Sequence, residues 1–581
     1  MKKKMRSIGW ATIVGVSYFA AAALHGQDTR TVTEPSFPPV CTHLKAQLLK
    51  TGPSGLDIAV ETMADTGRIQ SALDLCPSGQ AVALRRGRVN DAFLIAPIRI
   101  PPGVTLLVGA GVTVFASRNP RDYDANAGKA CGTIAATSSG CLPLITANRS
   151  DDAGIMGDGI IDGRGELPLL IDGVPSKASW WDLANQANEQ KLSQNCPRML
   201  QVSNTNNFTL YKITLMNSPN FHVALGNDTN FTAWAIKIIT PYDARNTDGI
   251  DPGYSSNVTI TNSYISDGDD NVAVGGNNLP GASNISVTNN HFGDGHGASI
   301  GSFTQAGVSN VLFDRISFAG DRANGNQTGI RIKSDVSRGG LVQNVAYRNI
   351  CMQNVRHAIV FDPFYTAGAT GNLIPRFSNI TLQNVHATTE GSVKMQGHDA
   401  DAPLTLTLNN VQIDGIKSSD ITQQYATYTL GPDPVNFASM LMGSGVTVSN
   451  NVSNSNPPYD CPDSVFAPIA GELLPARRPR SGAPGLAVRA KVFTTKAVPY
   501  QTYLTNLERD PNATLALTAP TGTIAVYEGE TALGTAQLDG GQIVTIPLPE
   551  LSMGTHALRA TYSGDANYPG IAFGNYTLTV P

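Results

Sequence analysis

The stretch Asn257-Val258-Thr259-Ile260 places an asparagine directly before a short β-rich run, and this pattern recurs through the middle of the chain. The copies are Asn207-Phe208-Thr209-Leu210, Asn230-Phe231-Thr232-Ala233, Asn257-Val258-Thr259-Ile260, Asn284-Ile285-Ser286-Val287, Asn310-Val311-Leu312-Phe313, Asn344-Val345-Ala346-Tyr347 and Asn379-Ile380-Thr381-Leu382. Their first residues are 23, 27, 27, 26, 34 and 35 residues apart. This period predicts a β-solenoid, because one coil buries its apolar face only by stacking on the next. Asparagine suits a left-handed turn, and its amide can stack on that of the next coil.

The composition extends the β prediction to the whole chain. Its 581 residues exceed one ordinary compact core, and 57 glycines and 36 prolines separate short Val/Ile/Leu/Thr runs. We therefore predict an all-β protein with a solenoid over residues 35–470, a linker rich in Pro, Arg, Gly and Ser over 471–485, and a β-sandwich over 486–581. The segment 65–75 is the one clear helix, placed to cover the open end of the solenoid.

The first 26 residues have the features of a secretory signal peptide. Four basic residues precede an apolar run that ends in small residues, and this run is short for a membrane-spanning helix. A membrane anchor is the alternative. Removal of the segment takes away four positive charges and no acid, so the net charge of −4 becomes −8. We expect a secreted monomer, extracellular or periplasmic, that binds neither nucleic acid nor membrane.

Seven cysteines in an exported chain predict disulfides with at least one thiol left over. Cys131–Cys141 is the favoured pair because it closes a short Gly/Ser loop. Cys41–Cys76 and Cys351–Cys461 are further candidates, which leaves Cys196 as a buried thiol. The cysteine and histidine spacing suggests no metal site, and no cofactor is expected.

Three aspartates lie within a narrow span: Asp248 in Asn246-Thr247-Asp248-Gly249, and Asp269 and Asp270 after Gly268. Residues 248 and 269 are 21 residues apart, about one coil, and coils stack at about 4.8 Å, so these acids can lie one above the other. Adjacent residues of a straight strand face opposite sides, and Gly268 permits the bend that would bring both to one groove. Glycoside hydrolysis needs such a cluster, in which crowding raises at least one pKa.

Four motifs follow one another in the order Asn246-Thr247-Asp248-Gly249-Ile250-Asp251, Gly268-Asp269-Asp270-Asn271, Gly295-His296-Gly297 and Arg331-Ile332-Lys333. Over roughly residues 40–460, this order resembles the polygalacturonases of glycoside hydrolase family 28. The resemblance implies a right-handed parallel β-helix that hydrolyses α-1,4-linked galacturonan with inversion. It implies that Asp269 is the general acid, that Asp248 and Asp270 hold and activate water, and that His296 lies beside them.

The substrate predicted from these motifs is an acidic polysaccharide, polygalacturonate or pectin. Arg331 and Lys333 share one face of a strand, and two such cations match a polymer with a carboxylate on every sugar. The resemblance adds Tyr365 as a substrate contact. Asn246 is a further candidate, and His222 either lines a subsite or packs in the core.

The resemblance leaves the cleavage pattern open. Gly297-Ala298-Ser299-Ile300-Gly301 is more like the endo-acting members, with an exo-polygalacturonase or a rhamnogalacturonan hydrolase as alternatives. A pectate lyase would need acids arranged for Ca²⁺ and an arginine base. From another class, the chain could be a silent solenoid that binds polysaccharide or a cell surface. The segments 554–556 and 562–568 resemble bacterial immunoglobulin-like domains, which act as spacers or weak binding modules.

Overall fold

The computed structural model describes residues 27–580 except 52–54, 126–127, 139, 478–485, 511–512, 514, 516–518 and 540–542. The predicted signal peptide, residues 1–26, lies outside the described residues. No helix in the described part of the chain combines the length and apolarity needed to cross a membrane.

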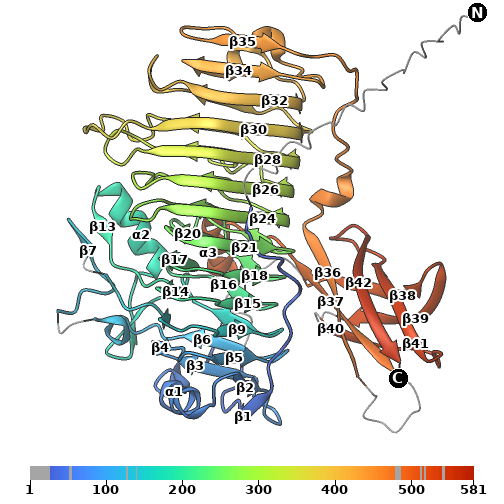
Figure 1. Cartoon of the computed structure of the whole chain (residues 1–581). Helices are drawn as coiled ribbons and strands as arrows, with labels where there is room; N and C mark the ends of the chain where they lie inside the picture. Colours follow the sequence, from blue (N-terminus) through green and yellow to red (C-terminus); the bar gives the residue numbers. More distant parts are fainter. Residues whose placement is uncertain are drawn as a thin grey trace, which may run out of the picture.

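A parallel β-helix forms the larger part of the molecule (Figure 1). One sheet has eleven strands, each paired in parallel with the strand of the next coil. These strands are β4 (Ile98–Arg99), β8 (Ile145–Asn148), β14 (Leu200–Ser203), β17 (Val223–Gly226), β20 (Ile250–Gly253), β23 (Val272–Val274), β25 (Ala298–Ile300), β27 (Thr328–Lys333), β29 (His357–Asp362), β31 (Ser392–Gln396) and β33 (Ile421–Gln424).

The remaining walls of the solenoid belong to a second sheet of twenty strands. They are β1 (Val40–Lys45), β2 (Gln80–Arg85), β3 (Ala92–Ile95), β5 (Val104–Val108), β6 (Thr113–Ala116), β9 (Gly154–Met156), β10 (Ile160–Asp162), β15 (Thr209–Tyr211), β16 (Thr214–Met216), β18 (Thr232–Trp234), β19 (Lys237–Ile239), β21 (Ser256–Thr261), β22 (Tyr264–Ser266), β24 (Ala282–Phe292), β26 (Val308–Ala319), β28 (Leu341–Gln353), β30 (Arg376–Ala387), β32 (Leu404–Ile413), β34 (Ala426–Leu430) and β35 (Thr447–Asn450). Two short hairpins, β7 (Ile134–Ala135) with β13 (Ser193–Gln194) and β11 (Leu170–Ile171) with β12 (Val174–Pro175), lie outside both sheets.

The repeat asparagines form the predicted ladder. All seven have left-handed backbone, with φ between 53° and 61°. The Asn344 amide donates to Asn310 Oδ1 at 3.2 Å, and the Asn379 amide donates to Asn344 Oδ1 at 2.8 Å. Each asparagine therefore makes the turn of its own coil, and Asn257, Asn310, Asn344 and Asn379 also donate to the repeat asparagine of the preceding coil.

Apolar residues of successive coils stack into columns inside the solenoid. Val258 is paired in register with Ile285, and Ile285 with Val311; all three are fully buried. Phe313 and Tyr347 continue this stacking with ring centroids 4.6 Å apart. Burial of such columns is the main stabilising contribution of a solenoid.

The structure has three α-helices among the described residues, two more than predicted. α1 (Thr66–Leu75) matches the predicted helix and buries Ile69 and Leu73 near the first coils. α2 (Trp180–Glu189) and α3 (Tyr500–Arg509) were missed. Both have ten residues, as α1 does, and isolated helices of this length are marginal, so each depends on tertiary packing.

The C-terminal domain is a β-sandwich. One sheet contains β36 (Ile469–Arg477), β37 (Ala487–Thr494) and β40 (Ile543–Pro547), and the other contains β38 (Thr521–Glu528), β39 (Thr531–Asp539), β41 (Gly554–Tyr562) and β42 (Ile571–Val580). The linker predicted over 471–485 is therefore wrong for 471–477, which pair with β37 as strand β36; residues 478–485 lie outside the described residues. Pro475 and Arg477, which were among the residues that suggested a linker, lie within this strand.

The sandwich packs against the side of the solenoid. Lys237 of β19 forms an ion pair with Glu472 of β36 at 2.7 Å, and the ring of Tyr264 packs edge-on against Phe493. The two domains are thus in contact.

The disulfide predictions are confirmed. Cys41–Cys76, Cys131–Cys141 and Cys351–Cys461 are bonded, and Cys196 is a buried free thiol. The last pair joins strand β28 to the segment that leaves the solenoid.

Candidate active site

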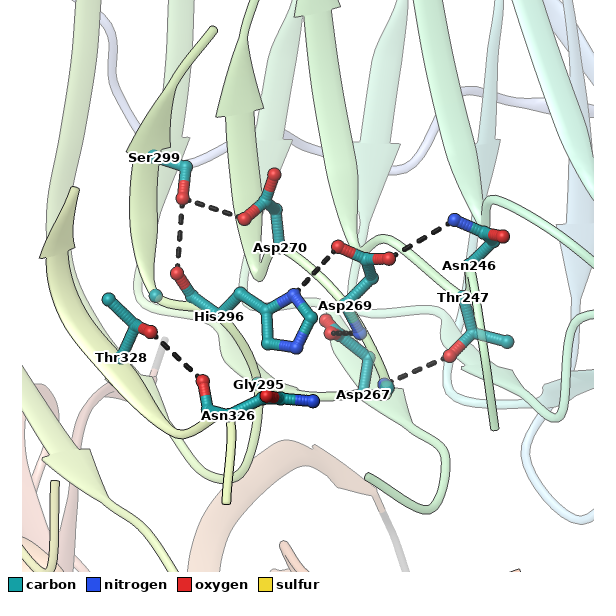
Figure 2. Close-up of polar contacts among 12 residues, drawn as sticks. Asn246, Thr247, Asp267, Asp269, Asp270, Gly295, His296, Ser299, Asn326 and Thr328 are labelled. Carbon is teal, nitrogen blue, oxygen red and sulfur yellow. Dashed lines mark hydrogen bonds and ion pairs between the residues drawn. The ribbon is translucent and has the colours of Figure 1, made fainter. Parts of the chain in front are cut away.

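The predicted catalytic side chains meet at one edge of the eleven-stranded sheet, and Figure 2 shows three of them, Asp269, Asp270 and His296. Asp248 precedes β20, Asp269 and Asp270 precede β23, and His296 precedes β25. Because these strands are consecutive neighbours in the sheet, the turns that carry the acids lie one above another. The stacking predicted from spacing is thereby confirmed.

The turn at Gly268 brings both adjacent aspartates into the site. A Cβ at position 268 would lie 2.0 Å from the carbonyl oxygen of Ala244, so only glycine fits this close approach. Thr247 Oγ1 accepts a hydrogen bond from Gly268 N at 2.9 Å, and Asp267 Oδ1 accepts one from Asp269 N at 3.0 Å. The predicted bend is present, and it depends on close packing of two turns.

Asp269 lies between a histidine and an amide. Its Oδ1 is 2.9 Å from His296 Nδ1, and its Oδ2 accepts a hydrogen bond from Asn246 Nδ2 at 3.2 Å. Burial alone would raise the pKa of Asp269, but the hydrogen bond and charge interaction with His296, assisted by Lys333 and Arg331, lower it below its ordinary value. Without substrate, Asp269 is therefore an ionised acceptor.

Asp270 is locked by cations and a hydroxyl. Lys333 Nζ donates to its Oδ2 at 2.6 Å, while Arg331 at 3.2 Å and Ser299 Oγ at 2.7 Å donate to its Oδ1. Asp270 and Lys333 are 2% and 5% exposed. Burial alone would lower the pKa of Lys333, but the charge of Asp270 raises it, so the ammonium stays charged.

Two further carboxyl groups of the site each have one oxygen atom that accepts no hydrogen bond from the described residues. Asp248 and Asp251 each have a buried Oδ1 without a hydrogen-bond partner among the described residues. Burial, reinforced by neighbouring aspartates, raises both pKa values well above the ordinary range. Burial has the same effect on the pKa of Asp267. The pKa values of several acids of the site are thus raised, and burial contributes more to this than the crowding from which a raised pKa was predicted.

His222 does not reach the groove. It is fully buried, with Nδ1 3.1 Å from the carbonyl oxygens of Thr247 and Asp248 and Nε2 3.0 Å from Thr240 Oγ1. Burial lowers its pKa to about 4. The prediction of His222 as a substrate contact is wrong, because its ring supports the backbone of the Asp248 turn from inside the solenoid.

A cavity of about 470 Å³ lies beside the acids, over the later coils of the solenoid. Its lining includes His296, Arg331, Tyr365 and Lys394. Tyr365 is 42% exposed, and its ring centroid lies 5.5 Å from the Arg331 guanidinium and 5.1 Å from Lys333 Nζ. The predicted binding residues Arg331, Lys333 and Tyr365 are thus brought together beside the acids.

A second cavity, of about 480 Å³, lies on the other side of the acids. Asn246, Gln194, Lys191 and Arg245 line it, and the Gln194 amide donates to Asn246 Oδ1 at 2.9 Å. Asn246 therefore stands between this cavity and Asp269. Cationic cavities flank the acid cluster on both sides.

Asp269, Asp270 and His296 are the described residues whose ligand atoms could together hold a metal ion, since those atoms lie within 4.8 Å of one another. Asp270 already accepts three hydrogen bonds through its two oxygens. Two of these bonds come from the cationic side chains of Arg331 and Lys333. A divalent cation would have to compete with Lys333 and Arg331 for the same carboxylate.

Three contributors were not predicted: Ser299, Lys394 and Gln194. Ser299 is paired in register with Arg331, and Lys394 lies two strands further along the same column, so strand alternation could have indicated both. Gln194 follows α2 in an insertion outside the repeat, where no periodic signal exists.

The fold and the carboxyl cluster define a glycoside hydrolase built on a parallel β-helix. Residues 103–430 match the model of Glycosyl hydrolases family 28, and the chain belongs to this family. Residues 495–581 match a bacterial Ig-like domain (group 3), which confirms the predicted nature of the sandwich.

Individual relatives give the same picture. A polygalacturonase of Ralstonia nicotianae is 39% identical over 493 residues, covering 75% of this chain and 92% of the relative. An endo-polygalacturonase of Pectobacterium carotovorum subsp. carotovorum is 41% identical over 418 residues, covering 71% of this chain and 96% of the relative. The solved polygalacturonase from Erwinia carotovora ssp. carotovora is 40% identical, with a TM-score of 0.62 over 69% of this chain and 100% of that one. This likeness confirms the right-handed β-helix.

Proposed function

We propose that the protein hydrolyses the α-1,4-galacturonosyl linkages of polygalacturonate and cuts within the chain. The observation that carries this proposal is the contact between the acid cluster and a cationic wall: Asp270 is bonded to both Lys333 and Arg331. Cations fixed beside an acid/base pair suit a polymer that presents a carboxylate next to the bond to be cleaved. The polygalacturonases among the relatives support the same substrate.

Asp269 is the proposed general acid that protonates the leaving glycosidic oxygen. It needs a proton that it lacks in the free site, where His296, Lys333 and Arg331 lower its pKa. A sugar carboxylate that binds at Arg331 and Lys333 would neutralise two of these influences and raise the pKa of Asp269. Asp248, whose pKa is raised, can pass its proton to Asp269 in the same cluster and is then itself ionised.

Water attacks the anomeric carbon while Asp248 and Asp270 orient it, and Asp248, ionised once it has given up its own proton, accepts the proton of the water. The spacing rule would favour a retaining mechanism, because ligand oxygens of Asp269 and Asp270 lie within 4.8 Å, whereas inverting pairs usually stand roughly 6.5–9.5 Å apart. Asp270, however, is held at both oxygens and is almost fully buried, which makes it a poor nucleophile. We therefore propose inversion, with ¹H NMR of the first-formed anomer as its test.

Cutting within the chain is favoured by the two cavities. Asn246 lines one and His296 lines the other, so sugars on both sides of the scissile bond would have room. An exo-acting enzyme, the alternative, needs a closed end that accepts only a chain terminus.

The product lengths formed from polygalacturonate by the purified protein test this proposal. Early products of many lengths, with a rapid fall in viscosity, are expected. Monomer or dimer alone from the first time point would establish exo action, and absence of any shortening would refute the hydrolase assignment. We further propose that the protein acts as an exported monomer, which is tested by the mass of the protein recovered outside producing cells.

A further inference from the structure

The segment of residues 495–503, termed the brace below, joins β37 of the sandwich to α3 and lies against the turns of the active site. Figure 2 shows a red-tinted ribbon of the C-terminal part beneath Asp267 and Asn326. The carbonyl oxygen of Thr495 would lie 3.5 Å from a Cβ at Gly293, three residues before His296. The brace thus contacts the solenoid on the side where the catalytic turns protrude.

The first attachment is at Asp243, in the turn that leads to Asp248. Its carboxylate caps α3: Oδ1 accepts a hydrogen bond from Tyr500 N, and Oδ2 accepts one from Gln501 N at 2.9 Å. A carboxylate at the N-terminus of a helix receives two free N–H groups and the favourable end of the helix dipole. The backbone N–H groups of Tyr500 and Gln501, in the C-terminal domain, therefore hold the carboxylate of Asp243 in place.

The same tyrosine holds α2. Tyr500 OH lies 3.0 Å from Ser179 Oγ and donates to Asp182 Oδ1 at 3.2 Å, and its ring packs edge-on against Trp181 at 5.1 Å. α2 lines the cavity beside Asn246. One wall of this cavity therefore depends on α3.

The second attachment is at Asp321. Lys496 Nζ pairs with its Oδ2 at 2.8 Å, and Asp321 N in turn donates to Asp294 Oδ1 at 2.9 Å. Asp294 lies two residues before His296, and its carbonyl oxygen accepts hydrogen bonds from Asp267 N at 3.1 Å and Asn271 Nδ2 at 2.8 Å. Two hydrogen bonds thus link Lys496 to the turn that carries His296, and a third links it to the turn that carries Asp269.

The first attachment is equally close to the acids. The carbonyl oxygen of Ala244, the residue after Asp243, accepts a hydrogen bond from Thr247 Oγ1 at 2.7 Å. The same hydroxyl accepts the hydrogen bond from Gly268 N. Both ends of the brace therefore connect to the turns of Asp248, Asp269 and His296 through hydrogen bonds and short lengths of backbone.

We propose that the C-terminal domain is part of the catalytic unit, with Asp243 and Lys496 as positioning residues that hold the acid-bearing turns in register. The proposal rests on the proposed hydrolysis for its activity readout. It replaces the prediction of a simple spacer. Turns outside the strands are the mobile part of a solenoid, and a displacement of about 1 Å in a catalytic group can cost 100-fold in rate.

The test uses the full-length chain with the conservative double substitution Asp243→Asn and Lys496→Gln. We expect kcat on polygalacturonate to fall at least tenfold with KM changed less than twofold. Hydrogen–deuterium exchange should become faster in residues 244–248 and 294–297 and stay unchanged in strands β28 and β30. The hydrogen–deuterium exchange measurement does not depend on catalytic activity, so it tests the positioning role even if the protein does not cleave polygalacturonate.

The matched control is Glu472→Gln, which removes the ion pair with Lys237 at the same domain contact but away from the turns. It should leave kcat and the exchange of the turns unchanged. The proposal is overturned if the double variant keeps its kcat and its turn protection, or if Glu472→Gln lowers kcat equally. Wild-type protein that leaves polygalacturonate intact would refute the proposed hydrolysis, while the exchange result would still decide on the brace.

Discussion

Replacement of Asp269 by asparagine should abolish most of the turnover and leave the fold intact. The substitution keeps the shape of the side chain and removes its capacity to donate a proton to the glycosidic oxygen. General acid catalysis of this kind contributes about 10²–10⁴ in rate, so kcat should fall by that factor. KM should change little, because Arg331, Lys333 and Tyr365 keep their positions.

The cost in stability follows from the contacts of Asp269. The variant loses the charge-assisted bond to His296, seen at 2.9 Å, which is worth about 1–3 kcal/mol. Because the folded pKa of Asp269 lies below its unfolded value, this contribution is present above about pH 4 and disappears as pH falls through the folded pKa. Wild type and variant should therefore differ in free energy of unfolding at pH 6 and converge in strong acid.

The assay compares initial rates of reducing-end formation at saturating polygalacturonate, well below the unfolding temperature, with circular dichroism as the check on folding. Asn206→Ala, in an exposed turn remote from the acids, serves as a control that should keep wild-type activity. A folded Asp269→Asn protein with kcat within tenfold of wild type would refute the assignment of the general acid.

Other consequences concern binding and pH. Lys333→Met removes one of the two cations paired with the buried Asp270, so it should lower the free energy of unfolding by about 3 kcal/mol; urea denaturation that shows less than 1 kcal/mol would contradict a buried ion pair. Tyr365→Ala should raise KM severalfold with a smaller effect on kcat, and an unchanged KM would remove Tyr365 from the binding surface. Burial raises the pKa of Asp228 to about 7 and that of Asp294 to about 6, so the folded state binds more protons than the unfolded state above pH 4. Stability should therefore be greatest near pH 4 and decline by several kcal/mol towards pH 7.5; stability that rises over this range in urea titrations would contradict these shifts.

The sequence was most informative where residues repeat. The Asn-led runs predicted coil spacing, left-handed turns and amide ladders, because the same local geometry recurs in every coil. The motif order likewise located the acids, His296, Arg331 and Lys333, since neighbouring coils place residues one period apart side by side. The bend at Gly268 followed from the need to bring two adjacent aspartates to one groove.

Features outside the repeat could not be predicted in this way. α2, α3 and Gln194 belong to insertions whose positions depend on tertiary contacts, such as Tyr500 against Trp181. His222 was ambiguous because an apolar neighbourhood accommodates a histidine once its ring finds partners, here Thr240 and two carbonyl oxygens. Strand β36 was hidden because the run rich in proline and arginine begins within it, at Pro475.

The most direct test of the central claim is incubation of the purified protein with polygalacturonate, with and without EDTA. The product is followed by reducing ends and by ultraviolet absorbance. Hydrolysis by the carboxyl cluster predicts new reducing ends in both conditions and no rise in absorbance, because no double bond forms. Absence of new reducing ends would contradict the claim, as would an EDTA-sensitive reaction whose unsaturated product absorbs in the ultraviolet.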